Sequence, residues 1–198
     1  MTRTATLFAA ALAMATAACA TAGARTHPAA THAAAAADTA RRITHTAADV
    51  EFMQGMLAHH AQALEMTELV SARTRRDDVR LLAERIDVSQ RDEMAAMRQW
   101  LRARGQDTTG AMHAGHAMPG MATAGEMARL AGFSGPAFDT LFLQLMTRHH
   151  EGALAMVARL FTMRGAGQEP AMFDFVSHVD SDQRIEISRM RVMLGTRP

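Results

Sequence analysis

The sequence predicts an all-α fold, an antiparallel four-helix bundle made of two repeated helical hairpins. The segment DVEFMQGMLAHHAQALEM at residues 49–66 recurs as DTLFLQLMTRHHEGALAM at residues 139–156. A second echo follows each copy, with Gln-Arg-x-Glu at 90–93 and again at 183–186. Apolar residues in these segments recur at steps of three and four, which is the helical period. Aromatic residues make up only 5% of the 198 residues and tyrosine is absent, which argues against a β-sandwich or barrel.

The first hairpin is expected to begin at Thr46, because Thr46 and Asp49 have the spacing of a capping box. Its first helix carries an apolar stripe that includes Phe52 and Met56, and Gly105 is well placed as the C-terminal stop of its second helix. The intervening turn at residues 74–78 is short, which predicts antiparallel neighbours.

The second hairpin has equivalent signals. Ser134-Gly135-Pro136 is expected to begin a helix, residues 165–167 to end it, and Gly195 to end the last helix. The turn at residues 164–169 is again short. Two such hairpins predict a domain over residues 46–198, with an inter-hairpin loop at 105–124.

Residues 1–24 read as a signal peptide. Arg3 supplies a positive start, and the uncharged, alanine-rich stretch at 7–18 is too short to span a bilayer. Cleavage before Cys19 would make a lipoprotein, since Ala17-Ala18-Cys19 resembles a lipobox; the rival is ordinary cleavage after a site such as Ala20-Thr21-Ala22. Either route predicts an exported protein of the periplasm or cell envelope, bound to the membrane where Cys19 carries a lipid.

Residues 25–45 are rich in alanine and threonine and are expected to be a flexible linker. The 21 basic residues nearly cancel the 20 acidic ones, so no net field favours nucleic acid as a partner. A single cysteine excludes an internal disulfide framework and a cysteine-based zinc site. Nothing in the sequence identifies a protein partner.

Polar and methionine residues share the inward face of the repeated helices. If the helices are level, His60 pairs with Glu93 and His150 pairs with Glu186, while His59 and His149 flank that face. One interpretation is structural: these bonds fix helix register and methionine fills the core. The other is that imidazole, thioether and carboxylate groups hold a transition metal. Adjacent histidines point 100° apart on a helix, so His59 and His60 are poorly placed to bind one ion.

The inter-hairpin loop adds a second candidate site. Residues 112–121, MHAGHAMPGM, contain three methionines and two histidines, and their glycines and proline disfavour regular structure. Thioethers select Cu(I), and imidazole suits Cu(I) and Cu(II). Over loop and helices together, the candidate metal ligands are Met53, Met56, His59, His60, Glu93, Met97, Met112, His113, His116, Met118, Met121, Met146, His149, His150, Glu186 and Met190.

The double motif D-x-x-F-[ML]-x-x-M-x-x-H-H-x-x-A-L-x-M, with its Q-R-x-E-x-x-x-M echoes, resembles the bacterial family called domain of unknown function 305. The resemblance covers about residues 46–196 and implies a ferritin-like four-helix bundle. Some members are described as periplasmic copper-binding or copper-resistance proteins, which implies a copper role here. By this resemblance, the copper role carries over to Met56, His59, His60, Met146, His149 and His150. This chain departs from the pattern at Leu143, which replaces the methionine of the first copy, and at Thr147, where members usually have an aliphatic residue.

These observations favour an exported copper-binding protein that buffers, sequesters or transfers copper and uses no organic cofactor. The alternative is a non-catalytic helical-bundle interaction protein of the envelope, with structural His/Glu pairs and no tight metal. An enzyme is less favoured, because no histidine follows a glutamate by three residues and no nucleophile-elbow, phosphate-loop or dinucleotide motif is present.

Overall fold

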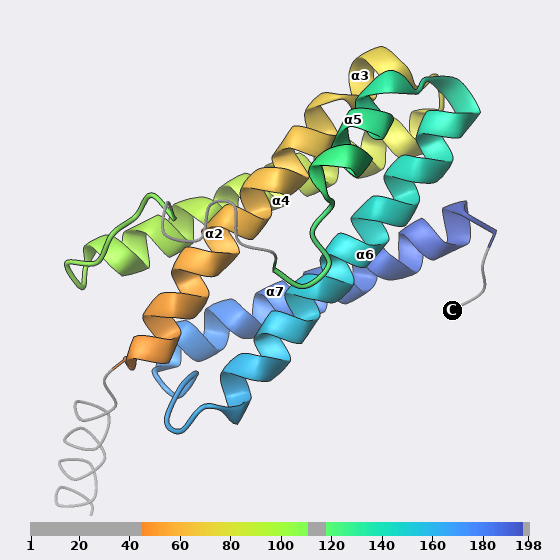
Figure 1. The fold of residues 1–198 in the computed structure, drawn as a ribbon. Helices are drawn as coiled ribbons and strands as arrows, with labels where there is room; N and C mark the ends of the chain where they lie inside the picture. Colours follow the sequence, from red (N-terminus) through yellow and green to blue (C-terminus); the bar gives the residue numbers. More distant parts are fainter. Residues whose placement is uncertain (1–44, 111–117, 196–198) are drawn as a thin grey trace, which may run out of the picture. The chain divides into compact units, whose positions relative to one another are not determined.

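The structure, a computed structural model, describes residues 45–110 and 118–195. Those residues form helices and no strand, which confirms the all-α prediction (Figure 1). The helices are α2 (Ala47–Glu68), α3 (Val70–Arg73), α4 (Asp77–Arg102), α5 (Ala124–Gly132), α6 (Gly135–Thr162) and α7 (Pro170–Met193). None of them is long and apolar enough to cross a membrane.

The long helices pack in pairs. Helix α2 packs extensively against α4, helix α6 against α7, and α2 also packs against α6 (Figure 1). Contact between α4 and α7 is much sparser. The α2–α6 contact therefore joins the two helix pairs, and it places the two His-His dipeptides of the sequence repeat on adjacent helices.

Local signals set the helix ends. The capping box predicted for α2 is confirmed: the Asp49 amide donates to Thr46 Oγ1 at 3.2 Å, and the Thr46 amide donates to Asp49 Oδ2 at 2.7 Å. Helix α6 has proline in its first turn, as expected. Gly105 and Gly195 follow the ends of α4 and α7 with φ of 66° and 73°, which a glycine adopts without the Cβ penalty of other residues.

Helix α5 is an element that the sequence analysis missed, and it begins at the last residue of the predicted loop at 105–124. A second capping box starts it, because the Glu126 amide donates to Thr123 Oγ1 at 3.2 Å and the Thr123 amide donates to Glu126 Oε2 at 2.8 Å. Leu130 is the one residue that α5 buries. The Thr-x-x-Glu spacing was the available signal.

Methionine forms a large share of the buried core. The fully buried methionines fall into two apolar clusters, one that includes Met53, Met56 and Met97 and another that includes Met66, Met146 and Met190. Flexible thioether side chains fill irregular space well. For the core methionines on the candidate-ligand list, packing is therefore a sufficient explanation of their position.

Asp49 and Asp139 occupy equivalent places in the sequence repeat but have different partners. Asp49 Oδ1 accepts the Gly167 amide at 2.7 Å from the α6–α7 turn, in addition to its capping role. Asp139 is equally buried, yet its Oδ1 has no hydrogen-bond partner among the described residues. One repeated carboxylate thus fastens a turn onto α2, and the other does not.

We expect Asp49→Ala to lower the free energy of unfolding by about 2–4 kcal/mol, because it removes a helix cap and leaves a buried amide unpaired. Asp139→Ala is the matched control and should not lower it, because Asp139 is also buried but its Oδ1 has no hydrogen bond to lose. Urea unfolding followed by circular dichroism measures both. Equal losses in the two variants would contradict this account of the α6–α7 turn.

Candidate functional site

Two histidine rings lie against each other where α2 meets α6. The ring centroids of His59 and His149 are 3.8 Å apart with an interplanar angle of 32°. Both side chains are buried. Two charged imidazolium rings at this separation would repel each other strongly in a medium of low dielectric. The contact is therefore compatible only with rings that are not both protonated.

Both rings of this pair are held in the neutral form. Burial, with a smaller contribution from His60, lowers the pKa of His59 to about 3. Burial and the neighbouring His59 place the pKa of His149 well below its usual value. His59 Nε2 lies 3.0 Å from the Pro119 carbonyl, and His149 Nε2 lies 3.0 Å from the His59 carbonyl. A carbonyl only accepts, so each Nε2 carries the hydrogen and each Nδ1 keeps a free lone pair.

The second histidine of each dipeptide points to a different helix. His60 Nε2 is 2.5 Å from Glu93 Oε2 on α4, and His150 Nε2 is 2.8 Å from Glu186 Oε2 on α7. Both predicted pairs are confirmed. The separate directions of His59 and His60 agree with the 100° expected between adjacent residues of a helix.

All four imidazoles have one arrangement in common. In each, Nε2 meets an oxygen atom, and Nδ1 is buried without a hydrogen-bond partner among the described residues. Histidines that bind metal almost always use their other ring N–H on a carboxylate or carbonyl in this way. An unpaired buried polar atom costs about 1–3 kcal/mol, so four of them call for an explanation beyond packing.

The C-terminal part of the methionine/histidine loop docks onto this histidine pair. Pro119 supplies the oxygen that His59 contacts, and Gly152 of α6 lies so close that a Cβ there would overlap the Pro119 carbonyl. Gln62 of α2 fixes the next turn, because its Nε2 donates to the Ala122 carbonyl at 2.8 Å and its Oε1 accepts the Ala122 amide at 2.7 Å. The loop end is therefore a built part of the α2–α6 interface.

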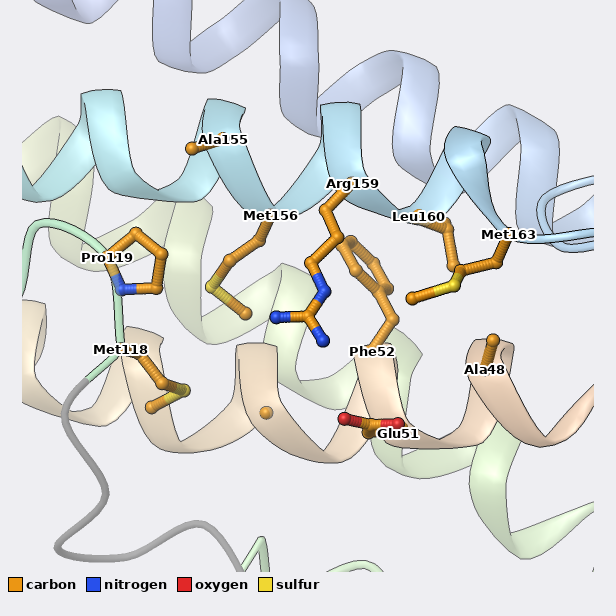
Figure 2. Close-up of a pocket in the computed structure, with 11 residues that line it drawn as sticks. Ala48, Glu51, Phe52, Met118, Pro119, Ala155, Met156, Arg159, Leu160 and Met163 are labelled. Atoms are coloured by element: carbon orange, nitrogen blue, oxygen red, sulfur yellow. The ribbon is translucent and has the colours of Figure 1, made fainter.

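Docking places Met118 in a pocket of about 140 Å³ between α2 and α6, with Met156 and Met163 (Figure 2). The absence of a side chain at Gly55 leaves room there: a Cβ would lie 3.7 Å from the sulfur of Met118 and 3.5 Å from the terminal methyl of Met156. Figure 2 shows the Met118 and Met156 thioethers on the same side of the pocket. Met118 is thus one residue from Pro119, the loop residue that His59 contacts, and Met156 lines the same pocket.

The structure does not gather all the predicted ligands in one place. Met53, Met56 and Met97 lie in one apolar cluster, Met146 and Met190 lie in the other, and Met118 lies in the pocket. Met121 is half-buried, and its carbonyl lies 3.4 Å from the Arg148 guanidinium. Met112, His113 and His116 lie outside the described residues, as do Cys19 and the predicted leader. In residues 45–110 and 118–195, no three His, Cys, Asp or Glu side chains are grouped to hold one ion.

Sequence reasoning missed two groups that define this site. Met156 ends the repeated motif, and Met163 directly follows α6, but neither was among the candidate ligands; only the docked loop shows that they share a pocket with Met118. Gly152 and Gly55 were also missed. A glycine within a helix costs stability relative to alanine, so each was a signal of close approach by another part of the chain.

Comparison with known proteins places this chain among helical domains without an assigned function. A family model described as "Domain of unknown function (DUF305)" matches residues 49–194. A crystal structure from Streptomyces coelicolor, described as "putative secreted protein DUF305", is 31% identical, with a TM-score of 0.64 over 76% of this chain and 95% of that one. A DUF305 fragment from Deinococcus radiodurans is 34% identical, with a TM-score of 0.66 over 76% and 97% of the two chains. No curated protein matches.

The neutral histidine pair predicts that the metal-free protein loses stability in mild acid. The unfolded chain takes up protons near the ordinary histidine pKa of 6.5, whereas His59 stays neutral down to about 3, so stability falls as pH falls through this window. Each such histidine should lower the free energy of unfolding by about 1.4 kcal/mol as the pH falls from 7.5 to 5.5. Urea unfolding at both values, with a chelator present, measures the sum. His149→Gln should remove about half of the loss, and an unchanged slope in that variant would contradict the assignment.

Proposed function

This chain belongs to the DUF305 family, and we propose that it is an exported protein that binds copper, chiefly as Cu(I), at the contact between α2 and α6. The observation that carries the proposal is the orientation of the buried histidines. His59 and His149 are neutral, each directs Nε2–H to a carbonyl, and each retains an unpartnered Nδ1. A protonated or hydrogen-bonded nitrogen is not available to a metal, and these two are neither.

The available donors favour a soft ion. In the described part of the chain, carboxylates and imidazoles do not converge in threes, so a site for zinc or another ion that needs several such ligands finds no support. Thioethers are the remaining donors, and they select Cu(I). Met118 and Met156 provide them beside the loop residue that contacts His59.

We assign the rest of the loop an accessory part in capture. Met112, His113 and His116 lie two to six residues before Met118 in the sequence. Their donor atoms therefore belong to the segment that leads into the docked end of the loop. A loop that receives copper and hands it to a fixed pair of thioethers and imidazoles suits buffering, sequestration or transfer. In an exported protein, thioethers also avoid the disulfide formation to which thiols are prone.

The proposal includes the finer architecture and the location. We propose that the α2/α4 and α6/α7 pairs are the two copies of a duplicated hairpin in a ferritin-like four-helix bundle; the repeated His–Glu bonds support this. We place the protein in the periplasm or cell envelope, with a lipid on Cys19 as its link to the membrane. The leader-like residues 1–24 and the description of the Streptomyces coelicolor relative support export.

The second candidate function is a non-catalytic interaction bundle without tight metal. The His60–Glu93 and His150–Glu186 bonds favour it, because each joins the two helices of a pair and thereby sets their register. In this case the buried histidines are structural, and copper affinity is no greater than that of exposed methionine and histidine side chains.

The test that separates the two functions is an anaerobic Cu(I) titration against a coloured chelator of known affinity. We expect the protein to withdraw Cu(I), and Met118→Leu with Met156→Leu to weaken it by at least about tenfold, since leucine preserves the packing volume but removes both donors. Met172→Leu is the matched control, a fully buried methionine of the core far from the loop in sequence. If the chelator keeps all the copper, or the double variant binds as tightly as the control, the proposed site is wrong.

Loop docking supplies an independent prediction. Gly152→Ala places a Cβ against the Pro119 carbonyl and should displace the loop end from His59 and Met156. We expect Cu(I) affinity to fall by about 10- to 100-fold, the size of effect seen when groups that orient ligands are lost.

The matched control for loop docking is Gly125→Ala in α5, where a Cβ would meet nothing within 4 Å. It should leave affinity unchanged and raise stability slightly through helix propensity. Far-ultraviolet circular dichroism of both variants checks that the helices persist. A Gly152→Ala protein that folds and binds copper normally would show that the docked loop plays no part in the site.

A further inference from the structure

Three large apolar side chains are exposed at the turn between α6 and α7. Phe161, Met163 and Phe173 have exposed fractions of 43%, 38% and 52%. The rings of Phe161 and Phe173 meet edge to face with centroids 6.3 Å apart, so the two phenylalanines form one patch. We call these three residues the turn patch. Phe161 packs against the turn itself, where Ala166 and Gly167 are buried and a Cβ on Gly167 would overlap the Phe161 ring.

The N-terminal part of the chain joins the domain beside the turn patch. A Cβ on Gly165 would lie 3.7 Å from the Thr46 side chain, and the Gly167 amide bonds to Asp49 Oδ1 in the first turn of α2. Figure 1 shows the start of α2 at the same end of the helices as the α6–α7 turn. The described chain therefore begins at the end that carries the exposed aromatic rings, and Cys19 precedes that point in the sequence.

Basic side chains flank the turn patch. Arg159 and Arg164 are exposed, and no ion pair to either is formed within the described residues. Arg104, at the same end, is already neutralised by Glu169. Two exposed acids adjoin the patch, since Asp174 follows Phe173 and Glu51 of α2 lines the pocket that Arg159 and Met163 also line. Exposed aromatic rings with arginines that form no ion pair beside them are typical of surfaces that approach lipid headgroups.

We propose that the turn patch rests on the surface of a lipid membrane that borders the compartment to which the protein is exported. The phenylalanines enter the boundary between headgroups and acyl chains, and Arg159 and Arg164 meet the lipid phosphates. The proposal rests on the exported location given above, but it requires neither copper nor the lipid on Cys19. A lipid on Cys19 would hold the same end of the domain near the surface and raise the effective concentration of the patch there.

The exposed apolar side chains of α4 lie among acidic residues instead. Leu81 and Val88 of α4 line a groove that also contains Glu84, Asp92 and Asp182. An anionic membrane repels such a surface. This groove supplies the matched control, because it offers two apolar residues of greater exposure on a different face of the molecule.

The single tryptophan makes the orientation measurable. Trp100 is the only tryptophan of the chain, and its Nε1 donates to Glu169 Oε2 at 2.9 Å, one residue before α7 begins. Its fluorescence therefore reports on the end of the molecule that carries the turn patch. Brominated lipids quench tryptophan only at short range, so quenching requires this end to approach the bilayer.

The experiment uses protein that begins at Arg25, so that neither the predicted leader nor a lipid is attached, mixed with vesicles of phosphatidylglycerol and phosphatidylcholine. We expect flotation with anionic vesicles, weaker flotation with pure phosphatidylcholine, and quenching of Trp100 by brominated lipid. Phe161→Ser with Phe173→Ser should lower vesicle partitioning by at least about tenfold, while Leu81→Ser with Val88→Ser should not. Phe173→Ser alone is the milder variant in case the double one unfolds, and it should lower partitioning by several fold.

Three results would overturn the proposal: no vesicle binding, binding without quenching of Trp100, or equal binding by the patch variants and the control variant. Absence of vesicle binding would leave the turn patch to a protein partner. The chelator titration, repeated on Phe173→Ser, keeps this outcome separate from the copper proposal. That variant should retain wild-type Cu(I) affinity, because Phe173 does not line the methionine pocket.

Discussion

The contact between the His59 and His149 rings is the interaction on which the candidate site depends. It lies at the α2–α6 junction that joins the two helix pairs, so the rings must fit within the space between two close helices. Burial keeps both rings neutral, and neutrality allows them to stack. Neutrality also leaves the Nδ1 lone pairs free, because each Nε2 donates to a carbonyl. The property that stabilises the junction is therefore the same one on which the proposed copper site relies.

The interior between the helices also contains several buried polar atoms that have no hydrogen-bond partner among the described residues. Both side-chain polar atoms of Gln90 and the Oε1 atom of Gln183 join the four Nδ1 atoms as buried groups without a hydrogen-bond partner among the described residues. A core chosen for stability alone would place apolar side chains here, because a partly satisfied polar network is less stable than apolar packing. Departures of this kind are expected where function, rather than folding, selects the residues.

Sequence reasoning predicted the features that arise from local spacing. Helical period, the Thr46–Asp49 capping box and the glycine stops depend on residues within one or two turns, and the His60–Glu93 pair needed only two helices at the same level. The Met118–Met156 pocket could not be predicted in this way. It depends on a loop that crosses α2 and α6 and on the missing side chains of Gly55 and Gly152, and periodicity carries no information on either.

The two copies of the sequence repeat differ most where the loop docks. His149 donates to the backbone carbonyl of His59, and strict equivalence would require His59 to donate to the carbonyl of His149. His59 donates instead to the Pro119 carbonyl, so a loop carbonyl replaces the helix carbonyl that the sequence repeat would lead one to expect. The same side holds Met118 beside Met156. Divergence of Asp139 from Asp49 does not touch this junction, whereas the exchange of a helix carbonyl for a loop carbonyl connects the histidine pair to a methionine- and histidine-rich segment. A repeat that had remained symmetric would stack its histidines equally well, but it would bring no loop thioether to them.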